Sequence, residues 1–118
     1  MLSAIEHDDD LVIGTEKGYL CIFSLEDFSP LAKQKLKRSA TALGSFARNL
    51  LVVGMESGWL AAVVTWGSEL QIKCQTQFDE IGDISSVEVT SQEDLLVASK
   101  KGLFVVNYAD GKGFEIKY

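Results

Sequence analysis

The densest group of polar side chains in this chain is the run His7-Asp8-Asp9-Asp10. Carboxylates clustered beside an imidazole are ligand types that bind divalent cations in proteins. The central glycine and distal glutamate that complete a calcium-binding loop are missing from this run. Aspartates are also frequent in solvated hairpin turns, because their side chains hydrogen-bond the nearby backbone. We therefore interpret the run as a turn, and we expect neither a metal ion nor a cofactor.

The inventory of nucleophiles and bases argues against an enzyme. His7 is the single histidine of the chain, so a nucleophilic triad would depend on one residue of an exposed turn. The sequence contains no Gly-x-Ser-x-Gly elbow and no phosphate-binding loop that ends in Lys-Ser or Lys-Thr. Acid pairs such as Asp79-Glu80 are adjacent in predicted turns and do not converge on a substrate. We expect no catalytic residues.

Aromatic and basic side chains offer candidate contacts for a partner. Trp59 begins an apolar run and is expected in the core, whereas Trp66 lies in a predicted loop, where it is either an exposed anchor or part of the core. Lys33, Lys35, Lys37 and Arg38 form a basic stripe on one predicted outer strand. Lysines in this arrangement protect a sheet edge from aggregation, and a phosphate or acidic-peptide site is the alternative interpretation.

The overall composition limits the classes of partner. The chain has 118 residues, 47% of them apolar, and a net charge of −6 at pH 7. Nucleic acids and anionic membranes attract basic surfaces, so we expect protein partners, no nucleic acid and no membrane. Cys21 and Cys74 are too few for a disulfide framework. We interpret them as reduced, buried thiols and expect a cytoplasmic or nuclear protein.

Three stretches of the chain are closely similar. Each contains an apolar run, a small residue, turn residues and a glycine, and they cover residues 11–20, 51–60 and 95–104. The second starts 40 residues after the first, and the third starts 44 residues after the second. Gly18, Gly58 and Gly102 are expected to close a hairpin in each copy, where the backbone needs a positive φ. A period of this size is typical of a β-propeller blade.

Each copy predicts four strands, named a to d in chain order. Strands b and c are nearly continuous apolar runs and are expected to be buried on both faces. Strand d alternates in polarity, so Leu70, Ile72 and Cys74 are expected to face the same way. The expected strands cover residues 2–5, 11–14, 19–24 and 31–36, then 40–46, 50–54, 59–64 and 70–76, and finally 84–89, 95–99, 103–108 and 114–118.

These repeats resemble the WD-repeat β-propeller family over essentially the whole chain. The apolar pair, small residues and turn ending in glycine match the family pattern, whereas its Trp-Asp and Gly-His pairs are absent. The resemblance implies an all-β fold of three four-stranded antiparallel blades, a partial ring. We expect one β-propeller segment over residues 1–118, with blades at approximately 1–37, 38–77 and 78–118.

Closed propellers have about four to eight blades, so three blades form an incomplete ring. We expect three blades to leave two open edges of unpaired backbone, and such edges bind partners. Further blades, from the same protein or from another subunit, are the first candidates to complete the ring. A homodimeric six-bladed ring and a small open β-domain are the alternatives.

The resemblance implies a non-enzymatic protein–protein interaction scaffold. In the family, the b–c turns and the links between blades share one face, which is often the binding face. A small-ligand or glycan-binding propeller is the alternative function, and it predicts similar pockets in each copy, whereas the loop residues here differ between copies. The residues predicted to bind a partner are Lys17, Lys37, Arg38, Met55, Glu56, Phe78, Asp79, Ile81, Lys100 and Lys101.

Overall fold

Twelve β-strands form three separate sheets in the computed structural model, which describes residues 2–7, 10–15, 17–47, 50–66, 69–90, 94–109 and 112–117. Each sheet has four antiparallel strands in chain order, so each is a simple meander. The expected fold class, all-β with three four-stranded antiparallel blades, is confirmed.

The strands lie where the repeats predicted them, with ends that differ by at most two residues. The first blade contains β1 (Leu2–His7), β2 (Asp10–Thr15), β3 (Tyr19–Ser24) and β4 (Pro30–Lys35). The middle blade contains β5 (Ala40–Ala47), β6 (Leu50–Met55), β7 (Trp59–Trp66) and β8 (Glu69–Gln77). The third blade contains β9 (Ile84–Val89), β10 (Asp94–Ser99), β11 (Gly102–Ala109) and β12 (Gly113–Ile116).

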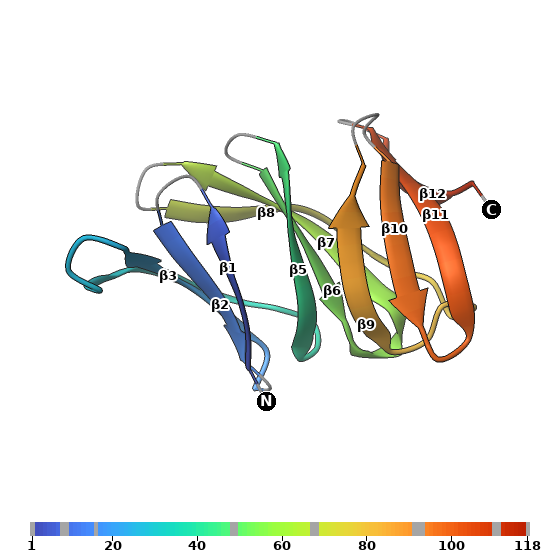
Figure 1. Cartoon of the computed structure of the whole chain (residues 1–118), viewed down its shortest axis with the longest axis horizontal. Helices are drawn as coiled ribbons and strands as arrows, with labels where there is room; N and C mark the ends of the chain where they lie inside the picture. Colours follow the sequence, from blue (N-terminus) through green and yellow to red (C-terminus); the bar gives the residue numbers. More distant parts are fainter. Residues whose placement is uncertain are drawn as a thin grey trace.

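The blades stack face against face, with like strands opposite each other. β5 contacts both β1 and β9, and β8 contacts both β4 and β12. Figure 1 shows the first blade in blue, the middle blade in green and the third blade in orange, side by side along the longest dimension of the molecule. This stacking makes the middle blade a layer with a neighbour on each side.

The core consists of two apolar clusters, one at each junction between blades. The first joins β2 and β3 to the middle blade and includes Val12, Leu20, Ile22, Leu51, Val53, Ala61 and Val63. The second joins the middle blade to the third and includes Val52, Leu60, Ala62, Leu95, Val97, Val106 and Tyr108. Successive residues of a strand point to opposite faces, so β6 and β7 contribute alternately to the two clusters.

Burial on both faces is confirmed for strands b and c of the middle blade, where residues 51–55 and 60–63 are all buried. In the flanking blades the corresponding strands bury alternate residues, as in the series Leu11, Val12 and Ile13, where Val12 alone is buried. The prediction is therefore wrong for the outer faces of the flanking blades, because no blade of this chain covers them.

We expected unpaired backbone edges at the two ends of the arc. The structure instead leaves sheet faces uncovered there. Each blade is a complete four-stranded sheet, and the junctions between blades consist mainly of side-chain packing. A missing neighbour consequently uncovers an apolar sheet face on the first blade and another on the third.

A β-bulge overturns the expected facing of strand d in the middle blade. Cys74 pairs with Ala62, and Ile72 pairs with Val63, so Lys73 lies between the two pairs without a place in the register. The side chain of Cys74 therefore packs on the cluster shared with the third blade, whereas Leu70 and Ile72 pack on the cluster shared with the first. One extra residue reverses the alternation of a strand.

Helical structure is confined, within the described ranges, to the 3-10 turn Glu56–Gly58 between β6 and β7. No helix in this part of the chain has the length and apolar character that a membrane crossing requires.

Candidate binding surface

The hairpin turns between strands b and c gather at one edge of the molecule, together with the links between blades. We name this edge the turn-and-link face; it appears at the bottom of Figure 1. In the described residues it comprises the turns at 17–18, 56–58 and 100–101 and the links at 36–39 and 78–83. This grouping follows from the meander, because strands a and c run in one direction and strands b and d run in the other.

Backbone hydrogen bonds fix the link between the middle and third blades. The amide of Phe78 donates to the carbonyl of Gly58 at 2.9 Å, and the amide of Ile81 donates to the carbonyl of Phe78 at 3.0 Å. Gly58 has a φ of 77°, and a Cβ at this position would lie 2.1 Å from the carbonyl oxygen of Phe78. Glycine is therefore required for the link to pass this close to the turn.

Side-chain hydrogen bonds connect the same link to both neighbouring turns. The carboxylate of Asp83 accepts from the amide of Ser57 at 2.8 Å, and the Ser99 hydroxyl donates to the carbonyl of Ile81 at 2.6 Å. The ammonium of Lys101 donates to the carbonyl of Asp79 at 3.1 Å. The link is thus anchored from the middle blade and from the third blade.

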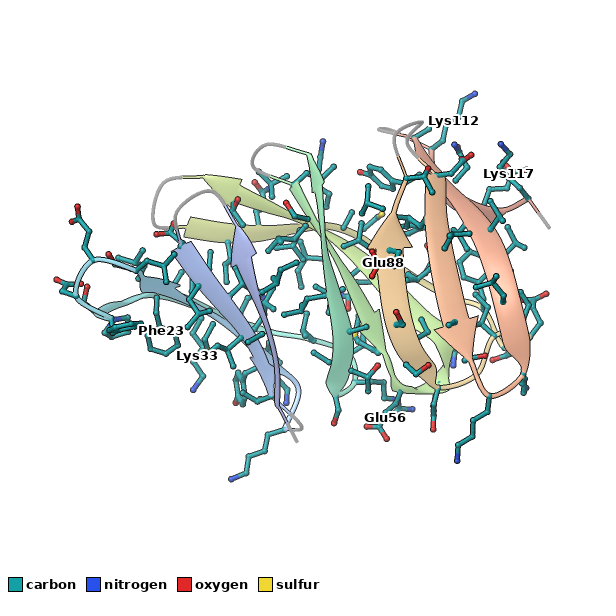
Figure 2. The ribbon with its side chains drawn as sticks, in the orientation of Figure 1. Phe23, Lys33, Glu56, Glu88, Lys112 and Lys117 are labelled. Carbon is teal, nitrogen blue, oxygen red and sulfur yellow. The ribbon has the colours of Figure 1, made fainter. Side chains whose placement is uncertain are left out.

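These contacts surround a groove of about 500 Å³ between the two blades. Charged side chains of both signs line it. Of these residues, Lys100, Asp79 and Asp83 are exposed to solvent. Its lining residues are Ser57, Gln77, Asp79, Ile81, Gly82, Asp83, Lys100 and Lys101. Glu56 projects from the same edge, as Figure 2 shows.

The junction between the first and middle blades repeats part of this arrangement. The amide of Leu36 donates to the carbonyl of Gly18 at 2.7 Å, which is the counterpart of the bond between Phe78 and Gly58. Lys17, Lys37 and Arg38 are exposed here. The backbone amide of Lys37 donates to the side chain of Gln75 in the middle blade at 3.3 Å.

The structure thus brings most of the predicted binding residues to one edge, in two groups. Lys17, Lys37 and Arg38 lie at the first junction, and Glu56, Phe78, Asp79, Lys100 and Lys101 lie at the second. Their role in binding stays a prediction.

Met55 and Ile81, two of the predicted binding residues, do not offer exposed side chains to a partner. Both side chains are fully buried, Met55 in the cluster with the first blade and Ile81 in the cluster with the third. Met55 is the last residue of β6 rather than a turn residue, and the Ile81 side chain points from the link into the core. The prediction that these two residues contact a partner directly is therefore wrong, because both belong to the core.

Sequence reasoning missed four residues of the groove: Ser57, Gln77, Gly82 and Asp83. Ser57 was assigned to the turn, but its backbone contact with Asp83 was not foreseen because the two are 26 residues apart. The glycine at position 82 and the aspartate beside it were the available signal, since both types are common where a link turns sharply.

The remaining candidate residues contribute no site. Asp8, Asp9 and the His7 side chain lie outside the described residues, as does the side chain of Trp66. Trp59 is half-buried and packs on the core, as expected. Among the described residues, His, Cys, Asp and Glu form no group of three that is suited to a metal ion. Cys21 and Cys74 form no disulfide, and both are half-buried rather than buried as expected.

Comparison with known proteins gives a fold and no closer relationship. No protein-family model matches the chain. No curated protein matches it in sequence either.

The structure of the chain is clearly similar to solved structures of β-propellers. The β-propeller domain of Cps50 (Swd1) from Myceliophteria thermophila superimposes with a TM-score of 0.74 at 13% identity, covering 96% of this chain and 37% of that one. The WD40 repeats of RRP9 give a TM-score of 0.65 at 17% identity, covering 79% and 32%. The N-terminal domain of Nup159 gives 0.64 at 15% identity, covering 98% and 36%.

The chain therefore has the β-propeller fold with blades like those of WD-repeat propellers, and the expected resemblance is confirmed at the level of the fold. It spans about a third of the length of these propeller structures. A longer part, 63%, is covered in the computationally designed Ika4 protein, at a TM-score of 0.67 and 15% identity.

Proposed function

We propose that this chain is a non-enzymatic protein-interaction scaffold that binds a segment of a partner protein on its turn-and-link face. The observation that carries the proposal is the groove between the middle and third blades, whose backbone walls are held by hydrogen bonds while its charged side chains remain exposed. Rigid sheets that position exposed loop residues are a common basis of recognition.

The chemistry of the groove favours a peptide over a small ligand. It presents the cations Lys100 and Lys101 beside the carboxylates Asp79 and Asp83, and such a mixture complements a segment that carries both charge types. The link at the other junction, residues 36–39, is shorter and contains no acidic residue, so the carboxylates of the link 78–83 are not repeated there. A glycan-binding or small-ligand propeller, the alternative function, predicts equivalent pockets at successive junctions.

Related propeller structures support protein partners in general. One solved structure contains yeast Dbp5 bound to Nup159 and Gle1, and the N-terminal domain of Nup159 is similar in fold to this chain. For this chain we propose protein partners, no nucleic acid and no membrane, in keeping with its net charge of −6. We also propose a location in the cytoplasm or nucleus.

Reversing one charge in the groove tests the proposal. Lys100→Glu changes an exposed turn residue that lines the groove, and Lys112→Glu is the matched control on the opposite edge, at the top of Figure 2. Partners would be cross-linked to the wild type and to each variant and quantified by mass spectrometry. We expect Lys100→Glu to lose partners that Lys112→Glu retains. Equal recovery with both variants would exclude this groove as the binding site.

A further inference from the structure

The outer faces of the two flanking blades are the largest features that the turn-and-link face does not explain. On the first blade, β2 and β3 present Leu11, Ile13, Cys21 and Phe23 away from the middle blade, and all four are only half-buried. On the third blade, β10 and β11 likewise present Leu96, Ala98, Leu103 and Val105 away from it.

Leu103 shows that these faces lack a neighbour. By strand pairing it occupies the position of Leu20 in the first blade and Leu60 in the middle blade, since each lies opposite the small residue of strand b. Leu20 and Leu60 are 0% exposed, whereas Leu103 is 66% exposed. The same residue type at the same position is buried wherever a following blade exists.

The chain already contains both halves of the interface that is missing. Each blade has two faces: one presents the residue equivalent to Leu20, and the other presents the residue equivalent to Ala61. At both internal junctions, the first kind of face on one blade packs against the second kind of face on the next blade. The third blade exposes a face of the first kind, and the first blade exposes a face of the second kind, with Cys21 at the position of Ala61.

The first blade's uncovered face also contains a hollow. Cys21, Phe23, Pro30, Leu31, Ala32 and Lys33 line a space of about 450 Å³. Phe23 and Lys33 lie beside each other on this side of the molecule in Figure 2. Apolar side chains of an incoming sheet face would have room to pack there.

The charges on the two uncovered faces are opposite. The first blade carries Lys33 and Lys35, whose ammonium groups lie 4.1 and 4.6 Å from the centre of the Tyr19 ring. The third blade carries exposed Glu88 and Glu115, and the Asp94 of the same face is paired with Lys117. Because outer strands lie against outer strands at both internal junctions, continuation of the stack brings β12 with Glu115 against a β4 with Lys33 and Lys35.

We propose that a second copy of this chain covers both faces, so that two chains close a ring of six blades. The third blade of each copy packs on the first blade of the other, which makes a closed, symmetric head-to-tail pair. Six blades lie within the range of about four to eight that closed propellers use. This inference uses the ends of the arc and is independent of partner binding at the groove.

The first measurement is the mass of the purified 118-residue chain in solution, by light scattering coupled to size-exclusion chromatography at micromolar concentrations. We expect a discrete species of twice the 12.9 kDa chain mass. A monomer or a polydisperse aggregate would overturn the proposal.

Complementary charge reversals distinguish ring closure from any other dimer. An acidic variant, Lys33→Glu/Lys35→Glu, and a basic variant, Glu88→Lys/Glu115→Lys, each place like charges at both interfaces of a self-pair. We expect each variant alone to dissociate about 100-fold more readily than the wild type. An equimolar mixture restores attraction at both interfaces, so the dimer returns. Variants that dimerise like the wild type, or a mixture that stays monomeric, would contradict ring closure.

Circular dichroism checks that the charge variants fold. Leu103→Glu gives a second route, because this side chain is exposed in the single chain and its replacement leaves the core intact. We expect a folded monomer. A folded Leu103→Glu chain that dimerises as tightly as the wild type would equally overturn the proposal. Lys100→Glu is expected to leave the dimer unchanged, which separates this test from that of the groove.

Discussion

The middle blade and the third blade have similar strands in different surroundings. In the middle blade both faces of strands b and c are buried, whereas the third blade buries only the face toward its neighbour. The apolar residues of its other face, such as Leu96 and Val105, correspond to Val52 and Ala62, which are fully buried in the middle blade. Burial here is thus set by the neighbouring blade, and the sequence of the third blade fits a position inside a ring.

The largest expected effect contrasts the b–c turns of these two blades. In Gly58→Ala the new Cβ would lie 2.1 Å from the Phe78 carbonyl oxygen, at a φ of 77°. Steric overlap and backbone strain together predict a loss of about 4 kcal/mol in the free energy of unfolding. Gly102→Ala is the control, because only its φ of 141° is unfavourable and no atom lies within 4 Å of the new Cβ. Urea unfolding measures both, and equal losses would show that the link does not constrain the turn.

The next contrast concerns Leu60 and Leu103, which share a position in the register but differ in burial. Leu60→Ala is expected to destabilise the fold by about 3 kcal/mol, since it leaves a cavity in the core. Leu103→Ala is expected to change stability by less than about 0.5 kcal/mol when the chain is monomeric. Urea unfolding in the Lys33→Glu/Lys35→Glu background keeps association out of the comparison. A large loss for Leu103→Ala in that background would mean that its face is covered within the single chain.

A smaller effect is expected where strand b carries its small residue. At Gly54 an added Cβ would lie 2.6 Å from the Cγ2 of Ile84 in the third blade, so Gly54→Ala overpacks the junction and costs about 2 kcal/mol. The third blade has Ala98 at this position, facing its uncovered side. Ala98→Gly should cost about 1 kcal/mol or less, through backbone entropy alone. Thermal unfolding of both variants tests this order, and the reverse order would refute it.

The smallest effect is expected at Asp94, which with Asn107 forms a polar pair where the middle blade has an apolar pair. Leu50 and Val64 of the middle blade correspond to Asp94 and Asn107, and Asp94 also forms a 3.2 Å ion pair with Lys117. Hydrogen bonds from Asn107 and Lys117 hold the pKa of Asp94 below its ordinary value of 3.8. A lowered folded-state pKa contributes stability above the unfolded value, and this contribution is lost as the pH falls through the folded one.

Urea midpoints of the wild type should therefore drop slightly between pH 5 and pH 3 relative to those of Asp94→Asn. The difference is expected to be small because the group is near solvent. Asp94→Asn keeps the size of the side chain and removes only the titrating charge. Parallel pH profiles of the two proteins would show that this carboxylate does not contribute.

The sequence was sufficient to predict the three meanders, because each repeat carries its own strands and turns. It was not sufficient for the register of the third hairpin. The glycines at 58 and 102 align in the sequence, but Ser99 pairs with Gly102, so only Lys100 and Lys101 form the turn. The turn is one residue shorter than in the middle blade, and Leu103 consequently aligns with Leu60 rather than with Trp59.

The candidate surface was predictable as an edge and not as individual contacts. The meander places b–c turns and links together regardless of their residues, so Glu56, Lys100 and Lys101 were found. Met55 and Ile81 were misjudged because local pattern does not show which link residues turn into the core. That information depends on contacts between residues far apart in the chain, such as the bond from Ser99 to Ile81.

The amide that follows strand d returns to the hairpin of its own blade, from Leu36 to Gly18 and from Phe78 to Gly58. The first meander thus satisfies its exit amide before the chain enters the second, and the second does so before the third. A duplicated or deleted blade therefore keeps both partners of this exit hydrogen bond together. Chains built in this way are free to change the number of their repeats during evolution.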